Sequence, residues 1–405
     1  MKILIVNKFL YPNGGSETYI FEIGRQLTKM GHEVQYFGME HEGRIVGNHA
    51  ESYTRDMNFH GGGPDKLLYP FRIIYSREAR KKIRVVLNDF KPDVVHLNNF
   101  NFQITPSVIY EIRKWEKKNQ KRVPIIYTAH DYQWVCPNHM MMIPESGEKC
   151  FRCEDGKFGE CSKHRCIHNS RIKSLIGTME ASVYKWLRTY GKIDKVICPS
   201  HFMEEKLATN PLLADKLITL YNFLDAESPW KIPKKDYVLY FGRYSEEKGV
   251  RTLLKVCGEL PKIQFFFAGG GPLQEEIRKY SNVTDLGFLQ GEKLKQTIAQ
   301  ARFTVFPSEW YENCPFTVME TQKYGTPVIA SNIGGVPELV ADGVTGCLFQ
   351  AGDERQLSEK IRELWENEEL LEKYTENCKN VLFDTSEEYC EKLIEIGRAS
   401  CRERV

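Results

Sequence analysis

The chain has 405 residues and a formal net charge of +2, with 41% hydrophobic and 27% charged residues. This composition is typical of a globular protein of two or three domains. No run of eighteen apolar residues is present, which excludes a membrane-spanning helix, and the N-terminal segment lacks the long apolar run of a signal peptide. We therefore expect a cytoplasmic protein whose twelve cysteines are mostly thiols.

The charge is unevenly divided along the chain. Residues 1–200 contain 31 Lys and Arg against 21 Asp and Glu, whereas residues 201–405 contain 25 against 33. A basic half indicates an anionic partner, although solvated helix faces would give the same imbalance. Basic runs at 77–84 and 113–122 lead us to expect weak, salt-sensitive association with anionic membrane. No nucleic-acid partner is expected.

The first half alternates strand patterns with helical ones. KILIVN at 2–7 predicts a buried strand, and apolar residues at helical spacing then continue to Gly31, which ends the helix. This order predicts parallel strands joined by right-handed crossovers. Further strands are predicted at 33–37, 93–99, 124–130 and 195–200, and helices at 76–90 and 106–118.

The same alternation restarts in the second half, after a polar, proline-bearing stretch. We expect an α/β protein with two Rossmann-like, doubly wound domains that face each other across a cleft. The last residues are similar to a translated sequencing adapter and are expected to be non-native. The predicted parts are a first domain at 1–224, a linker at 225–235, a second domain at 236–380, a C-terminal helix at 381–394 that crosses back, and the tail at 395–405.

Gly14 and Gly15 lie in the turn after the first strand. They do not form the Gly-x-Gly-x-x-Gly fingerprint, so nicotinamide binding is not expected. A glycine pair before a helix can still bring backbone N–H groups up to a phosphate. A flexible loop is the alternative interpretation.

Arg243 and Lys248 follow the first strand of the second half, in the sequence FGRYSEEKG. The carboxyl ends of such strands are where open α/β sheets bind ligands. A guanidinium and an ammonium together could neutralise a diphosphate without a metal. Two exposed cations in a loop are the alternative.

Glu312 and Glu320 stand eight positions apart in WYENCPFTVMET. If Pro315 opens a helix at its first position, Glu312 lies in the preceding loop and Glu320 lies along the helix. Two carboxylates so placed could serve different parts of one elongated ligand. A solvated helix start is the alternative.

These motifs occur together, in one order. With them the chain resembles the retaining glycosyltransferases of family 4, which have the GT-B fold of two Rossmann-like domains. The resemblance covers 1–394 and is most specific over 237–350. The motifs that carry it are FGR at 241–243 with Lys248-Gly249, GGGP at 269–272, the Glu312–Glu320 pair, and SNIGGVPELVADGVTG at 331–346.

The resemblance implies a nucleotide sugar, UDP-, GDP- or ADP-linked, bound to the second domain. The residue matching Glu312 contacts sugar hydroxyls and the one matching Glu320 holds the ribose. Arg243 and Lys248 match the pair that stabilises the departing diphosphate, so that catalysis requires no cofactor or metal. The donor-binding set implied in this way is Gly14, Gly15, Arg243, Lys248, Asn313, Cys314, Pro315, Phe316 and Glu320.

Three polar residues at strand ends of the first half complete the expected site. His130 matches a family histidine close to the donor sugar, although it could instead be a histidine satisfied in the sheet edge. His96 and Asn98 end the previous strand and could line the acceptor side. The catalytic residues expected are Glu312, His130, Arg243 and Lys248.

The family resemblance predicts a retaining, hexosyltransferase-type enzyme. It would move a sugar to a glycan or lipid-linked acceptor in cell-surface polysaccharide synthesis, at the inner face of the membrane. A nucleotide-sugar epimerase of the same fold and a non-catalytic nucleotide-sugar-binding protein are the alternatives.

The segment 136–168 is rich in cysteine. Four of its sulfurs lie within 17 residues, and Cys-x2-Cys is a spacing suited to tetrahedral zinc. A structural zinc site would give this segment, which is poor in apolar periodicity, a reason to fold. An iron–sulfur cluster, free thiols and disulfides remain alternatives. The predicted ligands are Cys150, Cys153, Cys161 and Cys166.

Overall fold

The structure is a computed structural model of the chain, and it describes residues 1–56, 69–225 and 232–402. The chain divides into two compact units, Met1–Tyr221 with Ser386–Val405, and Asn222–Thr385. Part of the predicted linker and the end of the predicted tail lie outside the described residues.

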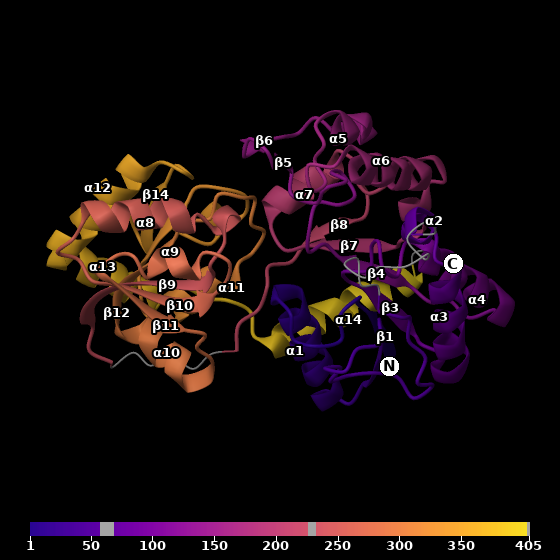
Figure 1. Ribbon diagram of the computed structural model, residues 1–405. Coiled ribbons are helices and arrows are strands. Elements are labelled where there is room, and N and C mark those ends of the chain that lie inside the picture. The colour runs from indigo at the N-terminus through magenta and orange to yellow at the C-terminus, as the bar shows by residue number, and fades with distance from the viewer. Residues whose placement is uncertain (57–68, 226–231, 403–405) are drawn as a thin grey trace. The chain divides into compact units, whose positions relative to one another are not determined.

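The first unit is built on a six-stranded sheet in the order β2-β1-β3-β4-β7-β8, with every neighbouring pair parallel (Figure 1). Both faces of a parallel sheet are covered, which explains why its strands are nearly continuous apolar runs. The strands are β1 (Lys2–Val6), β2 (Glu33–Phe37), β3 (Val94–Leu97), β4 (Ile125–Thr128), β7 (Lys195–Cys198) and β8 (Leu217–Thr219).

Three helices of this unit begin at a serine that caps them. Ser76, Ser170 and Ser200 each accept a hydrogen bond from a backbone N–H three residues on, which starts α3, α6 and α7. The helices predicted at 76–90 and 106–118 are confirmed to within a residue. The helices are α1 (Gly15–Lys29), α2 (Tyr69–Ile74), α3 (Arg77–Phe90), α4 (Ser107–Asn119), α6 (Arg171–Trp186), α7 (His201–Ala208) and α14 (Ser386–Arg402).

The C-terminal helix α14 is grouped with the first unit. It packs on α1, where the hydroxyl groups of Tyr389 and Tyr19 lie 2.8 Å apart. The helix begins at Ser386, later than the predicted 381, and continues through the first part of the predicted tail. Gly397 and Ser400, which belong to that tail, are buried in this packing.

The cysteine-rich segment contains only short regular elements. A hairpin of β5 (Met142–Ile143) and β6 (Glu148–Lys149) is followed by a 3-10 turn and by α5 (Gly159–Lys163). Its small apolar cluster includes Ile143 and Phe158 together with three cysteines, and it lies against α6.

The second unit repeats the architecture, with a parallel six-stranded sheet in the order β11-β10-β9-β12-β13-β14 (Figure 1). The strands are β9 (Lys235–Arg243), β10 (Phe265–Gly270), β11 (Val283–Gly287), β12 (Ala301–Phe306), β13 (Val328–Ser331) and β14 (Gly346–Phe349). The helices are α8 (Val250–Glu259), α9 (Gln274–Ile277), α10 (Gly291–Gln300), α11 (Phe316–Lys323), α12 (Glu354–Glu366) and α13 (Glu368–Cys378).

Alternate residues of β9 enter two different cores. Val238 and Tyr240 pack with α8, α12 and α13 on one face, whereas Leu239 and Phe241 pack with α10 on the other. The α/β class with two Rossmann-like sheets is therefore confirmed. None of the described helices is long and apolar enough to cross a membrane.

Candidate functional site

The second sheet has a topological switch point between β9 and β12. From β9 the chain moves outward through β10 and β11, and it then returns to the other side of β9 with β12. Loops that leave the carboxyl ends of β9 and β12 diverge there, and ligands of open α/β sheets bind at such a point. Arg243 ends β9, and Ser308 and Glu312 follow β12.

Glu312 connects several of the residues at this edge of the sheet through hydrogen bonds. Its Oε1 atom accepts hydrogen bonds from Lys248 Nζ at 2.5 Å, Ser308 Oγ at 2.7 Å and Trp310 Nε1 at 2.7 Å. The residue is only 9% exposed. The sequence places Glu312 in the loop before the helix, with a solvated helix start as the alternative. The structure places it in that loop, but the carboxylate is buried rather than solvated and three donors fix its orientation.

Two glycines of the family motifs allow the loops to approach. Gly249 has a φ of +67°, and a Cβ there would lie 1.8 Å from the carbonyl oxygen of Pro307. Gly334 has a φ of +59°, and a Cβ there would lie 2.2 Å from the carbonyl oxygen of Glu312. Only glycine fits such backbone approaches, so these two positions hold the β9, β12 and β13 loops against one another.

The two predicted phosphate-binding cations differ in their surroundings. Lys248 is paired with Glu312, and its ammonium lies 4.7 Å from the centre of the Trp310 ring. The exposed guanidinium of Arg243 makes no hydrogen bond or ion pair with any residue that the structure describes. Its five donors are therefore available to a ligand, whereas Lys248 can offer only the donors that Glu312 leaves free.

Glu320 lies on α11, and its carboxylate accepts no hydrogen bond from the part of the chain that the structure describes. Burial raises the pKa of this carboxyl to about 7, although Lys295 acts in the opposite direction. A partly desolvated carboxyl without a donor is suited to accept hydrogen bonds from hydroxyl groups of a ligand.

The residues between the two glutamates form the start of α11. Pro315 was expected at the first helical position, but it has extended backbone and precedes the helix, which begins at Phe316. Cys314 is buried, and Asn222 donates to it through the backbone N–H and the side-chain amide. The backbone N–H groups of Val318 and Met319, in the first turn of α11, both donate to the carbonyl oxygen of Pro315. Contact of Asn313 with a donor stays a prediction.

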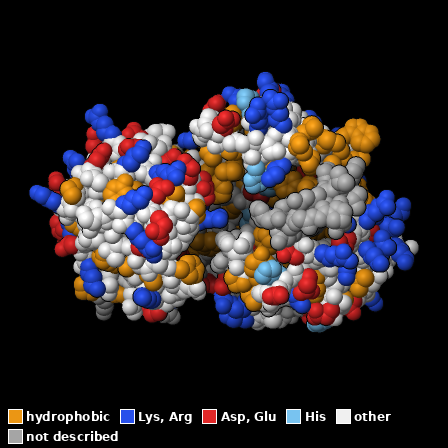
Figure 2. All heavy atoms as spheres, viewed as in Figure 1, with side chains coloured by type: hydrophobic (Ala, Val, Ile, Leu, Met, Phe, Trp, Pro, Cys, Tyr) orange, Lys and Arg blue, Asp and Glu red, His pale blue; other side chains and the backbone are white. Residues whose placement is uncertain are grey.

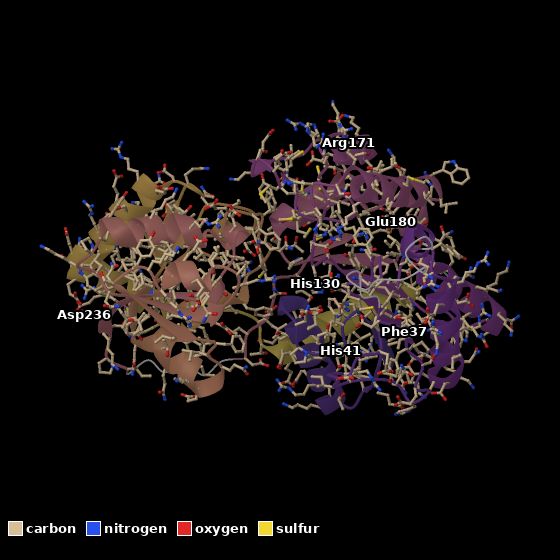
Figure 3. All side chains as sticks on the ribbon, viewed as in Figure 1. Phe37, His41, His130, Arg171, Glu180 and Asp236 are labelled. Carbon is tan, nitrogen blue, oxygen red and sulfur yellow. The ribbon has the colours of Figure 1, made fainter. Side chains whose placement is uncertain are left out.

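In the first unit, His130 and Asn98 are brought together just beyond the ends of β4 and β3. His130 Nε2 lies 2.9 Å from Asn98 Oδ1, and the His130 ring packs edge-on against Tyr19 with ring centres 5.1 Å apart. Figure 3 labels His130 in the first unit. Burial lowers the pKa of His130 to about 4. The imidazole is therefore neutral at pH 7.

His96 lies deeper than the sequence indicated. It is 1% exposed, and its Nε2 lies 2.8 Å from Thr128 Oγ1. It lines a small apolar pocket with residues of β1, β4 and α14. Burial lowers the pKa of His96 to about 3. His96 is consequently packed within the sheet layer, whereas Asn98 is linked to His130.

Gly14 is the N-cap of α1 and Gly15 is its first residue. A Cβ at Gly15 would meet nothing within 4 Å. The absence of a side chain there leaves open space over the helix start. Glu17, in the first turn, is buried and accepts hydrogen bonds from Asn7 and Ser16, which fixes the turn to the end of β1.

The comparisons with known proteins bear on both units. A family model described as Glycosyltransferase Family 4 matches residues 13–228, and one described as Glycosyl transferases group 1 matches residues 225–381. The chain belongs to glycosyltransferase family 4. The predicted family membership is thereby confirmed.

Similar proteins carry glycosyltransferase names. Sulfoquinovosyl transferase of Arabidopsis thaliana is 34% identical over 146 residues, which is 35% of this chain and 28% of that one. An uncharacterised glycosyltransferase of Methanocaldococcus jannaschii is 30% identical over 203 residues, 49% of this chain and 57% of that one. O-antigen chain mannosyltransferase C of Escherichia coli is 32% identical over 152 residues, 36% and 41% of the two chains. The matched region thus spans less than two thirds of each relative.

Solved structures of the same fold cover nearly the whole chain. Sucrose-phosphate synthase of Thermosynechococcus elongatus superposes with a TM-score of 0.69 over 98% of both chains at 17% identity. HepE of Anabaena, in complex with UDP and glucose, superposes with a TM-score of 0.64 over 98% of this chain and 100% of that chain at 17% identity. These likenesses confirm the GT-B fold.

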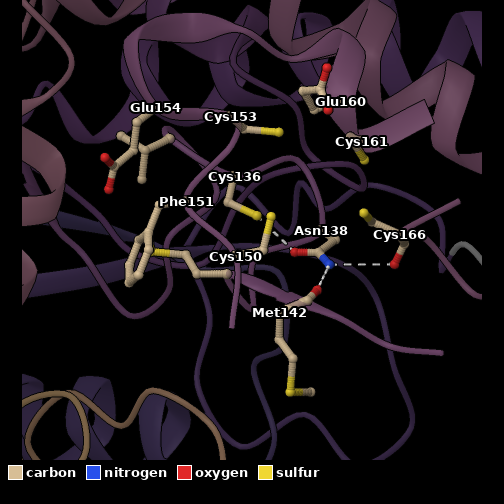
Figure 4. A pocket seen from close by; sticks show the side chains of 12 residues that line it. Cys136, Asn138, Met142, Cys150, Phe151, Cys153, Glu154, Glu160, Cys161 and Cys166 are labelled. Carbon is tan, nitrogen blue, oxygen red and sulfur yellow. Dashed lines mark hydrogen bonds between the residues drawn. The ribbon is translucent and has the colours of Figure 1, made fainter. Parts of the chain in front are cut away.

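The cysteine-rich segment of this glycosyltransferase gathers its sulfurs around one pocket (Figure 4). Across residues 1–56, 69–225 and 232–402, no three or more His, Cys, Asp or Glu side chains form a group that could hold a metal ion. All the cysteines are free thiols. Burial raises the pKa values of Cys136 and Cys153 to about 12. The lining cysteines are Cys136, Cys150, Cys153, Cys161 and Cys166.

Sequence reasoning missed two donors to Glu312. Ser308 and Trp310 lie only four and two residues before it, in PSEWYEN, and both point to the same carboxylate oxygen. A serine hydroxyl and an indole N–H just before a predicted site glutamate could have indicated that they donate hydrogen bonds to it. Tyr19 contacts His130, and Thr128 contacts His96. The sequence gave no signal for either contact, because the partners are far apart in the chain and only the packing of helix α1 and strand β4 brings them close to the histidines.

Proposed function

We propose that this family 4 glycosyltransferase is a retaining, hexosyltransferase-type enzyme that uses a UDP-, GDP- or ADP-sugar. The observation that carries the proposal is the edge of the second sheet, where the buried, oriented Glu312 lies beside Lys248. Arg243, which pairs with none of the described residues, occupies the end of β9 at the same edge. One anionic and two cationic groups at a switch point suit a ligand with hydroxyl groups and a diphosphate.

Each charged group has a proposed part. Arg243 and Lys248 bind the diphosphate and stabilise the charge that grows on it as the sugar leaves. Glu312 accepts hydrogen bonds from sugar hydroxyls, and Glu320 accepts them from the ribose. No metal is required in this proposal, because the two cations serve the diphosphate.

The proposed transfer exchanges one bond for another at the anomeric carbon. The bond to the diphosphate oxygen breaks and a bond to an acceptor hydroxyl oxygen forms, while the hydroxyl proton passes to the departing diphosphate. The anomeric configuration is kept. His130, neutral and held by Asn98, is proposed to orient donor or acceptor hydroxyls rather than to carry charge.

The proposed acceptor is a glycan or a lipid-linked glycan of the cell surface. Relatives named as an O-antigen chain mannosyltransferase and as a phosphatidylinositol N-acetylglucosaminyltransferase subunit, the latter of Schizosaccharomyces pombe, support this choice. The positive balance of residues 1–200 supports peripheral association with the cytoplasmic face of a membrane.

A panel of nucleotide sugars, with and without candidate acceptors, tests the proposal. Release of nucleoside diphosphate that depends on an acceptor is the expected result. Isomerisation of the donor without release would instead show an epimerase. Saturable binding without either reaction would show a nucleotide-sugar-binding protein, and both outcomes would contradict the proposal.

We also propose a structural zinc ion bound by Cys150, Cys153, Cys161 and Cys166. The support is that these thiols line one pocket in a segment with little regular structure. To bind one ion together, their side chains would have to change rotamer. Elemental analysis of protein purified without added metal should find close to one zinc per chain. Less than about 0.2 zinc or iron per chain, with freely titrating thiols, would contradict it.

A further inference from the structure

Helix α6 presents its large apolar side chains to solvent. Its buried residues are small or polar for the most part, namely Ser174, Gly177, Glu180, Ala181 and Tyr184. A surface helix normally shows the reverse arrangement, with its apolar stripe toward the core. The exposed apolar side chains, which we call the α6 face, are Ile172 at 73%, Leu175 at 52%, Met179 at 49%, Trp186 at 79% and Leu187, just past the helix, at 40%.

The α6 face is a continuous stripe rather than scattered exposure. Ile172, Leu175, Met179 and Trp186 are separated by three, four and seven residues. At about 100° per residue these positions fall within an arc of about 60° on one side of the helix. Hydrophobic side chains gather on the surface over α6 in the space-filling view (Figure 2).

The inner side of the helix explains why it cannot turn this stripe inward. A Cβ at Gly177 would lie 2.4 Å from Ile167 Cδ1, so the helix is seated closely on the cysteine-rich segment. Ser170 caps its start and Ser174 is fully buried. The seat at Gly177 leaves little room for a larger side chain, although Tyr184 is buried further along the helix, and the residues of the α6 face remain outside.

Cations lie near both ends of helix α6. The exposed side chains of Arg171, Lys173 and Arg188 make no hydrogen bond or ion pair with the residues that the structure describes, and Lys185 donates only to the carbonyls of Asp155 and Gly156. Figure 3 labels Arg171, the first residue of α6. The one acidic residue of the helix, Glu180, is buried, so it does not offset these charges at the surface.

The basic helices noted in the sequence have several of their arginines in ion pairs, whereas lysines such as Lys81 and Lys117 make no ion pair with the described residues. Arg80 and Arg84 of α3 both pair with Glu111, and Arg113 of α4 pairs with Asp194. Free cations and exposed apolar side chains coincide at α6 instead. This coincidence is the pattern of a helix that lies in a membrane interface, with apolar side chains at the acyl boundary and Lys and Arg at the headgroups.

We propose that the α6 face docks the first unit onto a bilayer surface rich in anionic lipid. Trp186 and its apolar neighbours enter the headgroup region, and Arg171, Lys173 and Arg188 contact lipid phosphates. A second copy of the chain is a poorer occupant, because a two-fold contact through this face would oppose identical cations. The inference rests on the lipid-linked acceptor of the proposed function, since docking brings the enzyme to that acceptor.

Vesicle co-sedimentation tests the docking. Wild-type protein should bind vesicles of phosphatidylcholine with phosphatidylglycerol at least about tenfold more tightly than pure phosphatidylcholine, and less tightly in high salt. The variant Ile172→Ser, Leu175→Ser, Met179→Ser should lose about tenfold or more of this binding. The matched control is Phe288→Ser with Leu382→Ser, two side chains of the second unit that are 74% and 87% exposed. This control should bind as wild type does.

Several results would overturn the docking: no binding to anionic vesicles at low salt, equal binding to neutral ones, or full binding by the triple variant. Oligomerisation that the triple variant abolishes, without lipid binding, would assign the face to a second copy. Nucleoside diphosphate release with a soluble acceptor is measured on the same preparations. Release without vesicle binding removes only the docking, and vesicle binding without release removes only the proposed transfer.

Discussion

The two sheets of this glycosyltransferase are both parallel and six-stranded, but they differ in strand order and in the chemistry of the edge formed by the carboxyl ends of their strands. In the second unit that edge carries the charged residues Arg243, Lys248 and Glu312. In the first unit it carries His130 and Asn98, which are both neutral at pH 7. Two parallel sheets of the same class thus present charged groups in one unit and the neutral pair His130 and Asn98 in the other. The difference teaches that fold class alone does not assign a ligand, whereas the side chains at the carboxyl edge do.

Among the residues that distinguish the two edges, Glu312 is expected to give the largest effect when its charge is removed. Glu312→Gln removes the acceptor charge but keeps the shape, and it should reduce transfer at least about a hundredfold. The fold should persist with a loss of about 1–3 kcal/mol of unfolding free energy, because three donors lose a charged partner. Turnover and urea unfolding measure the two effects.

Glu309→Gln is the matched control, because Glu309 lies in the same loop but accepts from Thr252 rather than from Lys248. Near-normal turnover of the Glu312 variant would show that the charged edge is not the reacting site.

Arg243 should affect ligand binding without affecting stability. Its guanidinium is exposed and unpaired among the described residues, so Arg243→Ala should leave the unfolding free energy unchanged. Loss of a charge-assisted contact to the diphosphate should weaken nucleoside diphosphate binding by about 1.5–3 kcal/mol, measured by calorimetry. Arg251→Ala, which removes an exposed arginine already paired with Glu246 and Glu276, is the control. Equal affinities of the two variants would exclude Arg243 from the site.

The two edges should also respond to pH in opposite directions. Burial raises the pKa of Glu320 to about 7, so its stabilising contribution is full below the unfolded value of about 4.5 and is lost as pH rises through 7. Burial lowers the pKa of His130 to about 4, so its contribution is full above the unfolded value of about 6.5 and is lost as pH falls through 4.

Urea unfolding at pH 5 and pH 8 measures both effects. Glu320→Gln should gain stability relative to wild type on going from pH 5 to pH 8, because Gln resembles the protonated carboxyl and does not lose a proton. His130→Gln should reduce the acid sensitivity of the first unit. Parallel pH profiles of wild type and both variants would show that neither group titrates as burial predicts.

The sequence predicted much of the fold because apolar periodicity marks buried strands and helices directly. The strand at 33–37 and the helices at 76–90 and 106–118 were found nearly to the residue. The ion pair of Lys248 with Glu312 was not found, because the partners are 64 residues apart and only the placement of β12 beside β9 joins them.

Helix α6 shows a different limit of sequence reading. Apolar residues at 172, 175, 179 and 186 have the spacing of a core-facing stripe, and nothing in that spacing says which side packs. Which side of α6 packs inward depends on Gly177 and Ile167. Their close approach places the side of the helix that carries Gly177 inward and leaves the apolar stripe outside. Apolar periodicity therefore predicts that a helix is present. The size of the residues on the side away from the apolar stripe determines whether that stripe is buried or exposed.

A crystal structure with an intact nucleotide sugar tests the charged edge most directly. The expected result is a diphosphate within hydrogen-bond distance of the Arg243 guanidinium and the Lys248 ammonium, with sugar hydroxyls on Glu312 and ribose hydroxyls on Glu320. A donor bound elsewhere, with Glu312 still contacted only by Lys248, Ser308 and Trp310, would contradict it.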